Sequence, residues 1–411
     1  MSQNFETEIG LLSLPLDVIF DILSYLDLKS LGRLSSVCKR LNLIVKNDYV
    51  WIERSKNAVV TNQISQEIKK RSFRQLSAKE KCRISQNWKC GKLAEDFLLV
   101  HRTPYMPWLQ LNNKYLWYSK ANTILCYERA IDGNIAKWPI HTLKGHIEDV
   151  CRFVCREGLI VSGGRDGAIC GWDEENGQFM FYLRRCHNSD INSVDIWNNV
   201  IVSGSRDKNV KIWVRQNGST SCQHLLQIRD RVWSVAIPPC GRSLLVGSAG
   251  YNGIPPLQLY DIEIGSRICT FGNGHRNGAG VLHVYPESSF ELLSCGYDTC
   301  VRMWDTRCGT ECVIQWEDPH DSAVYCVASD HHMTVLSGTS RHGLVRLWDK
   351  RMNKSLQMYY VGRGNSPVYS VTFDPSHAYV ALDRSLNVLS FSGQTHTNQT
   401  FRYAYTNGIT T

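Results

Sequence analysis

A short motif recurs along most of the chain, and this repetition limits the possible folds more than any other feature of the sequence. Its five clearest copies each end near an aromatic residue, at Trp172, Trp213, Tyr260, Trp304 and Trp348. Successive aromatic residues lie 41, 47, 44 and 44 positions apart. A period of roughly 40 to 45 residues is typical of arrays in which each repeat is a small unit that buries its apolar face against its neighbours.

Each repeat contains alternating apolar runs that are broken by Gly and Asp turns, which is the pattern of short strands. One repeat shows this in residues 150–154, 159–162 and 168–172. Two weaker copies extend the series, one ending at Tyr127 and one at Leu389. The sequence therefore predicts seven repeats of short antiparallel strands.

The copies share Ser-Gly-x-x-Asp a few residues before a Trp-Asp pair, and a His or Gly-His precedes the first strand. In these features the segment resembles the WD-repeat family. The resemblance implies an all-β, seven-bladed propeller over residues 93–411, with four strands in each blade. It also implies structural roles for a set of polar and aromatic residues: Asp166, Asp207, Asp298, His146, His187, Trp172, Trp213, Trp304 and Trp348.

Each turn aspartate is expected to hydrogen-bond the His that precedes its own blade, which for Asp298 is His275. A His-Asp pairing that repeats in several blades does not indicate an active site, since a catalytic pair is needed only once. The sequence also lacks a phosphate-binding loop, and its sixteen cysteines form no Cys-x-x-Cys pair. We therefore expect no enzymatic activity, no cofactor and no metal site.

Closing the ring requires a fourth strand for the last blade, and two segments could supply it. The segment Thr400–Tyr405 follows the last repeat at the position of the outer strands of earlier blades, and we expect it to form this strand. The alternative is that Asp96–Val100 returns from the N-terminal side to complete the sheet.

The N-terminal residues 11–52 follow a helical period instead of a strand period. Apolar residues recur three and four positions apart between Leu14 and Leu26, and Pro15 stands in the first turn. Two further short helices are predicted before Trp51, which is expected to pack inside them. Three short helices of about 40 residues bury too little apolar surface to fold alone. They need a partner or the segment that follows them.

These residues resemble the F-box family through Leu14-Pro15, the helix that follows, the Val37-Cys38-Lys39-Arg40 segment and Trp51. The resemblance implies docking to a small Skp-family adaptor, and through it to a cullin scaffold, by burial of apolar helix residues in the partner. The residues expected to bind the adaptor are Leu14, Pro15, Ile22, Leu23, Leu26, Leu31, Val37 and Leu41. The alternative is an internal helical bundle that packs on the propeller.

Residues 53–92 hold eleven Lys and Arg against three Glu, a balance of +8 that equals the formal charge of the whole chain. Their apolar residues are spaced for helices, so we expect a basic helical linker that acts as a stalk. The simplest interpretation of the charge is a solvated helical face, with a nuclear-import or RNA-contact patch as alternatives. Because the remainder of the chain is neutral, nucleic acid is not the expected partner.

An F-box followed by WD repeats resembles the substrate receptors of SCF-type ubiquitin ligases. The resemblance implies that the chain makes no bond itself and holds a protein substrate near a ubiquitin-charged enzyme. On the top face of the propeller, guanidinium groups would favour a phosphorylated or acidic segment, and aromatic rings would anchor it. The expected contact residues are Arg165, Arg206, Trp233, Tyr325, Arg341 and Tyr369.

The alternative function is a WD-repeat scaffold of an RNA or chromatin assembly, with the helices as a docking module. This function would use the basic segment 53–92 and would show strong salt dependence of nucleic-acid binding. No apolar run approaches the roughly 20 residues of a membrane span, and the N-terminus lacks the basic start of a secretory signal. We expect a protein of the cytoplasm, the nucleus or both, with no membrane partner.

Overall fold

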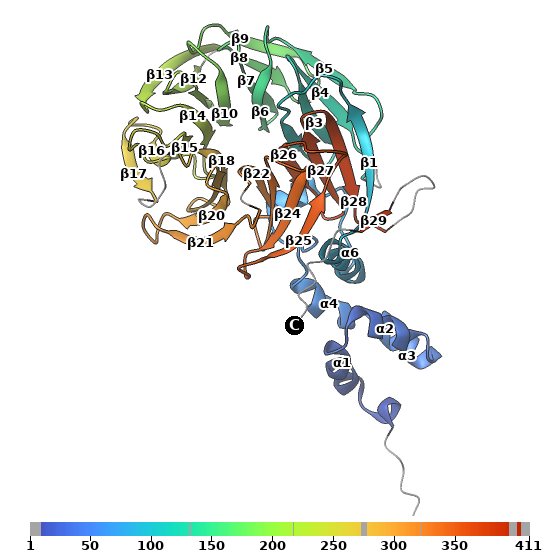
Figure 1. The fold of residues 1–411 in the computed structure, drawn as a ribbon. Coiled ribbons are helices and arrows are strands. Elements are labelled where there is room, and N and C mark those ends of the chain that lie inside the picture. Colours follow the sequence, from blue (N-terminus) through green and yellow to red (C-terminus); the bar gives the residue numbers. More distant parts are fainter. Residues whose placement is uncertain are drawn as a thin grey trace, which may run out of the picture.

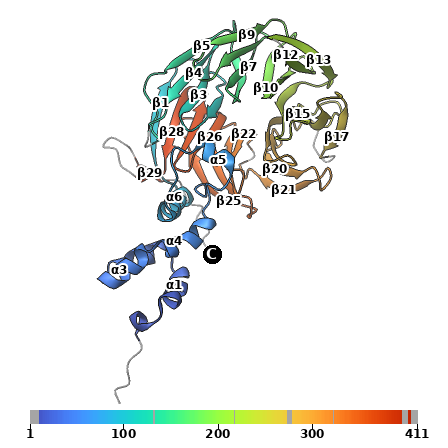
Figure 2. The same cartoon turned by 180° about the vertical axis from the view of Figure 1, so that it is seen from behind.

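The computed structural model is a ring of small β-sheets with a group of helices at its lower edge (Figure 1). It describes residues 10–130, 133–216, 218–272, 278–320 and 322–393, together with the backbone of 401–403. Seen from behind, helix α5 (Gln66–Arg71) lies over the ring beside the inner strands of its last blades (Figure 2).

The N-terminal helices are η1 (Leu11–Ser13), α1 (Leu16–Ser24), α2 (Leu28–Ser35), α3 (Lys39–Lys46) and α4 (Asp48–Lys56). Pro15 immediately precedes α1, where its missing N–H costs no hydrogen bond. The Asp27 side chain accepts from the Ser30 N–H at 2.7 Å and so caps α2. Polar and proline residues thus fix where these short helices begin.

One apolar core joins these helices, made by Ile19, Leu23, Leu31, Ile44, Val45, Val50 and Trp51. The Trp51 indole Nε1 donates to the Val45 carbonyl at 2.7 Å, so Trp51 packs inside the group as predicted. Cys82, from the linker helix that follows, belongs to the same core. The segment that follows the three short helices therefore contributes to their core, which is one of the two expected alternatives.

Helix α6 (Ala78–Cys90) is fixed at both ends. At its start, the Ser77 side chain accepts from the Glu80 N–H at 3.3 Å, and the Glu80 carboxylate accepts from the Ser77 N–H at 3.1 Å. At its end, Gly91 adopts φ 64°, a left-handed conformation that glycine takes without strain. This helix leads directly into the first strand of the propeller.

Seven sheets form the ring, which confirms the predicted seven-bladed propeller. The first blade contains β2 (Leu109–Leu111), β3 (Tyr115–Lys120), β4 (Thr123–Glu128) and β5 (His141–Lys144); the second β6 (Val150–Arg156), β7 (Leu159–Gly164), β8 (Ile169–Asp173) and β9 (Phe179–Leu183); the third β10 (Ile191–Trp197), β11 (Val200–Ser205), β12 (Asn209–Gln216) and β13 (Ser219–Gln227). The fourth contains β14 (Val232–Ala236), β15 (Ser243–Ser248), β16 (Leu257–Asp261) and β17 (Arg267–Phe271); the fifth β18 (Val281–Pro286), β19 (Glu291–Gly296), β20 (Cys300–Asp305) and β21 (Cys312–Glu317); the sixth β22 (Val324–Ser329), β23 (Thr334–Thr339), β24 (Leu344–Asp349) and β25 (Ser355–Tyr360). In every blade the third strand carries the repeat aromatic or its weaker equivalent.

The seventh sheet shows that the expected closure of the ring was wrong. Its order is β26 (Val368–Phe373), β27 (His377–Leu382), β28 (Ser385–Ser390), β1 (Lys92–Val100) and β29 (Phe401–Tyr403). The N-terminal strand β1 therefore supplies the fourth strand, and the segment expected there contains only the short β29 on its outer edge; residues 400, 404 and 405 lie outside the described part of the chain.

Strand β1 is suited to this position by the side chains that it buries. Leu93 and Ala94 are buried, and the buried Glu95 carboxylate accepts from the Asn387 amide and from the Gly362 N–H, both at 2.7 Å. Because α6 delivers β1 directly to the edge of β28, the two ends of the propeller are joined within one sheet.

The linker packs along the propeller and does not extend as a free stalk. Ile68, Leu76, Ile84 and Trp88 share a core cluster with strands of the sixth and seventh blades. The Val60 N–H donates to Thr334 Oγ1 at 2.8 Å, next to the turn between β22 and β23. The linker therefore covers the bottom face of the sixth and seventh blades, where their inner strands end.

Several basic linker residues are used in this packing. Arg71 donates to the Ser329 carbonyl, and Arg83 donates to the Ser392 carbonyl at 2.8 Å. Arg74 forms two hydrogen bonds with the Glu80 carboxylate, at 2.7 and 3.1 Å. Part of the linker charge thus holds the linker to the propeller and to itself.

Candidate functional site

The structure divides the predicted adaptor-binding residues into two groups. Pro15, Ile22 and Val37 are exposed, and Leu14 and Leu26 are half-buried, but Leu23, Leu31 and Leu41 are buried. These last three are corrected from surface to interior positions, because they lie on the inward faces of their helices. Ile22 and Leu23 illustrate the difference, since neighbouring helix residues point about 100° apart.

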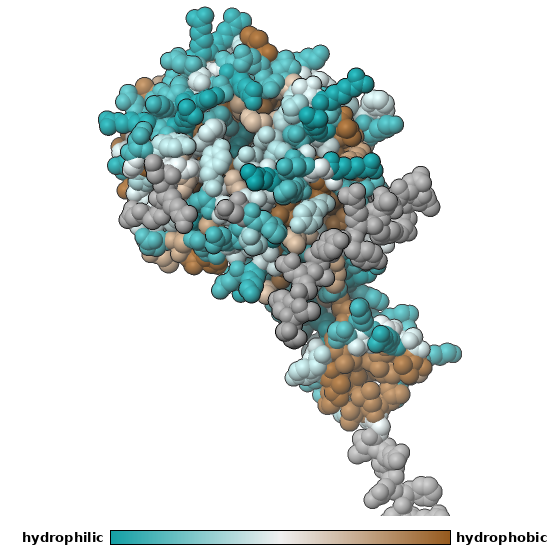
Figure 3. Space-filling view, in the orientation of Figure 1, coloured by the Kyte–Doolittle hydropathy of each residue, from teal (hydrophilic) through white to brown (hydrophobic). Residues whose placement is uncertain are grey.

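Further apolar residues of the helical group are exposed and were not predicted. They are Leu11, Leu16, Val18, Tyr25, Leu43, Tyr49 and Ile52, and Tyr25 and Leu43 are 90% and 71% exposed. Figure 3 shows the result as a broad hydrophobic surface on this part of the molecule, beside a mostly hydrophilic propeller. Such a surface on a small lobe is typical of a protein interface.

The third blade contains the complete polar chain that the WD-repeat resemblance implies. The His187 Nδ1 and Asp207 carboxylate are 3.0 Å apart, the His187 Nε2 and Ser203 Oγ are 2.8 Å apart, and the Trp213 Nε1 donates to Ser203 Oγ at 2.9 Å. Burial lowers the pKa of His187, more strongly than Asp207 raises it. A neutral His187 that donates to Asp207 and accepts from Ser203 satisfies every group of the chain.

Other blades repeat parts of this arrangement. In the second blade, His146 lies 3.0 Å from Asp166 and 2.7 Å from Ser162. The Trp304 and Trp348 indoles donate to serines of the neighbouring strands, each at 2.8 Å, and Trp172 is buried. These contacts support the structural roles that the WD-repeat resemblance implies. Asp298 accepts from Arg302, whereas its expected partner His275 lies outside the described residues.

The three aromatic residues predicted for the top face, Trp233, Tyr325 and Tyr369, occupy one recurring feature of the propeller. In six blades the ladder between the first two strands shifts register around the second residue of the inner strand. These bulged residues are Cys151, Asn192, Trp233, Leu282, Tyr325 and Tyr369. A bulge takes a residue out of the hydrogen-bonded ladder and redirects its side chain. The bulges therefore bring Trp233, Tyr325 and Tyr369 to the same end of the ring.

Two of the predicted arginines are not free. Arg165 Nη1 lies 3.9 Å from an Asp149 carboxylate oxygen, and Arg206 Nη1 lies 3.8 Å from an Asp190 carboxylate oxygen. Each aspartate comes from the loop that enters the same blade. Arg341 is exposed and has no ion pair among the residues that the structure describes. A phosphate at Arg165 or Arg206 would have to compete with a carboxylate already present.

The aromatic residues of the top face gather over the fifth to seventh blades. The rings of Tyr297 and Tyr325 lie 6.5 Å apart at 88°, and those of Tyr325 and Tyr369 lie 5.7 Å apart at 30°. We call these three residues the tyrosine arc. Burial raises the pKa of Tyr325 and of Tyr369. Trp233 is half-buried on the fourth blade, and its Nε1 has no hydrogen-bond partner among the described residues.

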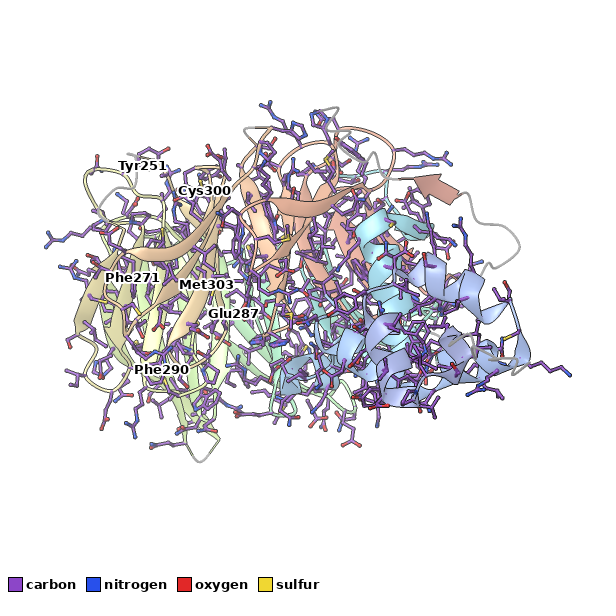
Figure 4. The ribbon with its side chains drawn as sticks, turned by 90° about the horizontal axis from the view of Figure 1, so that it is seen from below. Tyr251, Phe271, Glu287, Phe290, Cys300 and Met303 are labelled. Carbon is purple, nitrogen blue, oxygen red and sulfur yellow. The ribbon has the colours of Figure 1, made fainter. Side chains whose placement is uncertain are left out.

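The top face and the linker lie at opposite ends of the blades. Tyr325 stands near the start of β22 and Ser329 at its end, where Arg71 of the linker binds. Four residues of extended strand span about 13 Å. Figure 4 shows the same separation, with Tyr251 of a top turn at one end and Phe290 of a bottom turn at the other.

No group of three or more His, Cys, Asp or Glu side chains in the described residues is arranged to hold a metal ion. Within the same residues, none of the helices is both long enough and apolar enough to cross a membrane.

Sequence comparisons agree with both parts of the fold. The F-box-like family matches residues 11–56, and the WD domain, G-beta repeat family matches 137–173, 179–214, 265–305 and 311–349. The F-box/WD repeat-containing protein 4 of Mus musculus is 39% identical over 385 residues, which cover 92% of both chains. The chain belongs to the F-box/WD repeat-containing protein family. The protein of the same name from Homo sapiens matches with the same identity and coverage.

Within the F-box/WD repeat family, the length of the chain and the segment 87–92 before the propeller indicate a dactylin-like member. This prediction is confirmed, because F-box/WD repeat-containing protein 4 is dactylin. A more distant relative is the Cell division control protein 4 of Saccharomyces cerevisiae, 28% identical over 31% of this chain and 16% of its own.

Solved structures show the fold of the second part alone. The WD40 β-propeller domain of Doa1 superimposes with a TM-score of 0.58 at 19% identity, over 73% of this chain and 96% of that domain. The computationally designed Ika8 protein matches with a TM-score of 0.53 at 21% identity, over 69% of this chain and 82% of its own.

Proposed function

We propose that this F-box/WD repeat protein is the substrate-recognition subunit of an SCF-type ubiquitin-protein ligase complex. Its F-box binds a Skp-family adaptor, which attaches it to a cullin scaffold, and the top face of its propeller binds the protein substrate. The observation that carries this proposal is the fixed placement of an exposed apolar helical surface relative to an open propeller face at the opposite end of the blades.

The adaptor interface is supported by the side chains that remain exposed on the F-box. Ile22, Val37 and Leu43 gain little from internal packing, since they face solvent in the free chain. Burying apolar side chains of this size against a partner contributes roughly 1.5 to 3 kcal/mol each. A few such residues are sufficient for a stable complex.

The receptor makes no bond of its own and acts by proximity. Because α6 joins both the F-box core and the core of the last two blades, the distance between adaptor and substrate is set by packed side chains. A fixed distance raises the effective concentration of the substrate lysine near the ubiquitin-charged enzyme.

Co-purification with a recombinant Skp-family adaptor tests the first half of the proposal. The double variant Ile22→Asp and Val37→Asp places charges on the exposed F-box surface and should abolish adaptor capture while the unfolding transition of the propeller is retained. Ile264→Asp is the matched control, because Ile264 is 70% exposed, as Val37 is, but lies on the fourth blade. Capture of the adaptor at wild-type level by the double variant would refute the F-box interface.

A further inference from the structure

We propose that the tyrosine arc binds a proline-rich segment of the substrate in the polyproline II conformation. This inference rests on the proposed receptor function and names the chemical class of its substrate. It replaces the expectation of a phosphorylated or acidic segment, which was based on the arginines of the same face.

The aromatic surface of the arc is continuous. Ring centroids 6.5 and 5.7 Å apart place Tyr297, Tyr325 and Tyr369 in direct succession across three blades. Pyrrolidine rings pack well on such aromatic-lined surfaces, and a proline-rich chain presents them repeatedly along an extended backbone.

The arc also offers hydrogen-bond donors, the hydroxyl groups of its three tyrosines. None of the three hydroxyl groups has a hydrogen-bond partner among the described residues, whereas the Tyr359 hydroxyl donates to the Trp88 carbonyl at 2.6 Å and the Tyr379 hydroxyl to the Gly133 carbonyl at 2.9 Å. A polyproline II segment has carbonyl groups without internal partners and no N–H on its prolines. Three donors without a partner in the described part of the chain, beside an aromatic surface, complement a backbone that offers only acceptors.

Groups of both charge signs surround the arc. Of the charged groups that act on Tyr369, Asp383 raises its pKa and Arg165 lowers it, and Arg165 itself lies 3.9 Å from Asp149. Arg341 is the cation that acts on Tyr325. Because negative and positive groups both flank the arc, a doubly charged phosphate gains little electrostatic binding energy there. An uncharged segment likewise gives up little electrostatic binding energy in comparison.

The backbone that carries Tyr325 and Tyr369 is held in place by buried neighbours. Tyr325 and Tyr369 stand in bulges at the start of inner strands whose flanking residues, Val324 and Val368, are almost fully buried. Their rings are therefore positioned before binding. Polyproline II is also partly formed in the free peptide, so both sides lose little conformational entropy on association.

The test uses the full chain and three fluorescein-labelled peptides of equal length: decaproline, an alternating Gly-Ser peptide and an alternating Gly-phosphoserine peptide. Fluorescence anisotropy should show saturable binding of decaproline and weaker binding of the other two by roughly tenfold or more. Binding of decaproline should persist at about 0.5 M salt, since no charge pair carries it.

Two double variants separate rings from hydroxyls. Tyr325→Ser with Tyr369→Ser removes the rings and the phenolic hydroxyls, leaves only a short hydroxyl close to the backbone, and should weaken decaproline binding by roughly tenfold or more. Tyr325→Phe with Tyr369→Phe keeps the rings and should produce a smaller loss. Phe290→Ser is the control, because Phe290 is an exposed aromatic residue on the bottom face of the fifth blade, at the end opposite to the arc.

Binding of the phosphoserine peptide in preference to decaproline would overturn the inference, as would equal loss of decaproline binding in Phe290→Ser. Adaptor capture measured on the same preparations separates the two proposals. If the wild-type chain binds decaproline but does not capture the adaptor, the receptor function alone is refuted. If it captures the adaptor but does not bind decaproline, the substrate class alone is refuted.

Discussion

Trp88 of the linker helix α6 stacks face to face on Phe391 of the last blade, with ring centroids 3.5 Å apart and 14° between the planes. The Trp88 indole Nε1 donates to the Pro375 carbonyl at 3.0 Å, and its own carbonyl accepts from the Tyr359 hydroxyl at 2.6 Å. One residue thus ties the linker to two blades. Since Cys82 of the same helix lies in the F-box core, this contact sets the placement of the F-box on the propeller.

Replacing Trp88 with Ala should lower the free energy of unfolding by about 3 to 5 kcal/mol, the usual range for deleting a large buried aromatic side chain. Urea unfolding would measure this change in the free energy of unfolding. Amide hydrogen exchange of the native protein would locate it, and the exchange rate should rise more in α6 than in the second blade. Trp138→Ala is the control, because Trp138 is 75% exposed and should change stability little. Equal effects of the two substitutions would contradict the role given to Trp88.

Replacing Asp207 with Ala should cost about 1 to 3 kcal/mol, because it leaves the buried His187 Nδ1 without its partner. The free energy from urea unfolding measures this cost. Asp149→Ala, at a carboxylate with a 40% exposed side chain, is the control and should cost far less. An unchanged unfolding free energy for Asp207→Ala, together with lost substrate binding, would make Asp207 a contact residue instead.

Acid should destabilise the propeller in part through His187. Burial holds the pKa of His187 below its ordinary value of 6.5, so the unfolded chain takes up a proton on this ring at a higher pH than the folded chain does. The stability that this group contributes is complete above pH 6.5 and is lost as the pH falls through the folded pKa. Between neutral pH and pH 5, the melting temperature of the His187→Gln variant should fall less than that of the wild type. Identical pH profiles of the two proteins would show that the pKa of His187 is not lowered by folding.

The repeat pattern predicted the blades well because each blade is a local structure. The aromatic residues Trp172, Trp213 and Trp348 lie in third strands as expected, and the turn aspartates of the second and third blades lie against their histidines. All these contacts form within one repeat, so the order of residues along the chain contains the information.

The closing strand could not be predicted in the same way. Both Asp96–Val100 and Thr400–Tyr405 are short and rich in apolar residues, as strands are, and the choice between them depends on where α6 ends relative to β28. That position follows from the packing of Trp88 on Phe391, a contact between residues far apart in the sequence. The helical period likewise predicted the F-box helices but did not separate Ile22 on the surface from Leu23 in the core.

On the top face, the repeat register predicted the positions of Tyr325 and Tyr369 but not their surroundings. The aspartates beside Arg165 and Arg206 recur at one repeat position, three residues after His146 and His187, but the repeat pattern alone did not indicate that they lie against the arginines. Because these carboxylates would compete with a phosphate, we propose aromatic packing as the main mode of recognition on this face.

Reconstituted ubiquitin transfer tests the receptor function most directly. The wild-type chain, a Skp-family adaptor, a cullin scaffold and a ubiquitin-charged conjugating enzyme would be mixed with a lysine-containing protein fused to decaproline, and ubiquitin on the fusion would be measured. The receptor function predicts transfer by the wild type and by Ile264→Asp, and loss of transfer in the Ile22→Asp, Val37→Asp double variant. Undiminished transfer by that double variant, or no transfer by a wild-type chain that binds both the adaptor and the fusion, would contradict it.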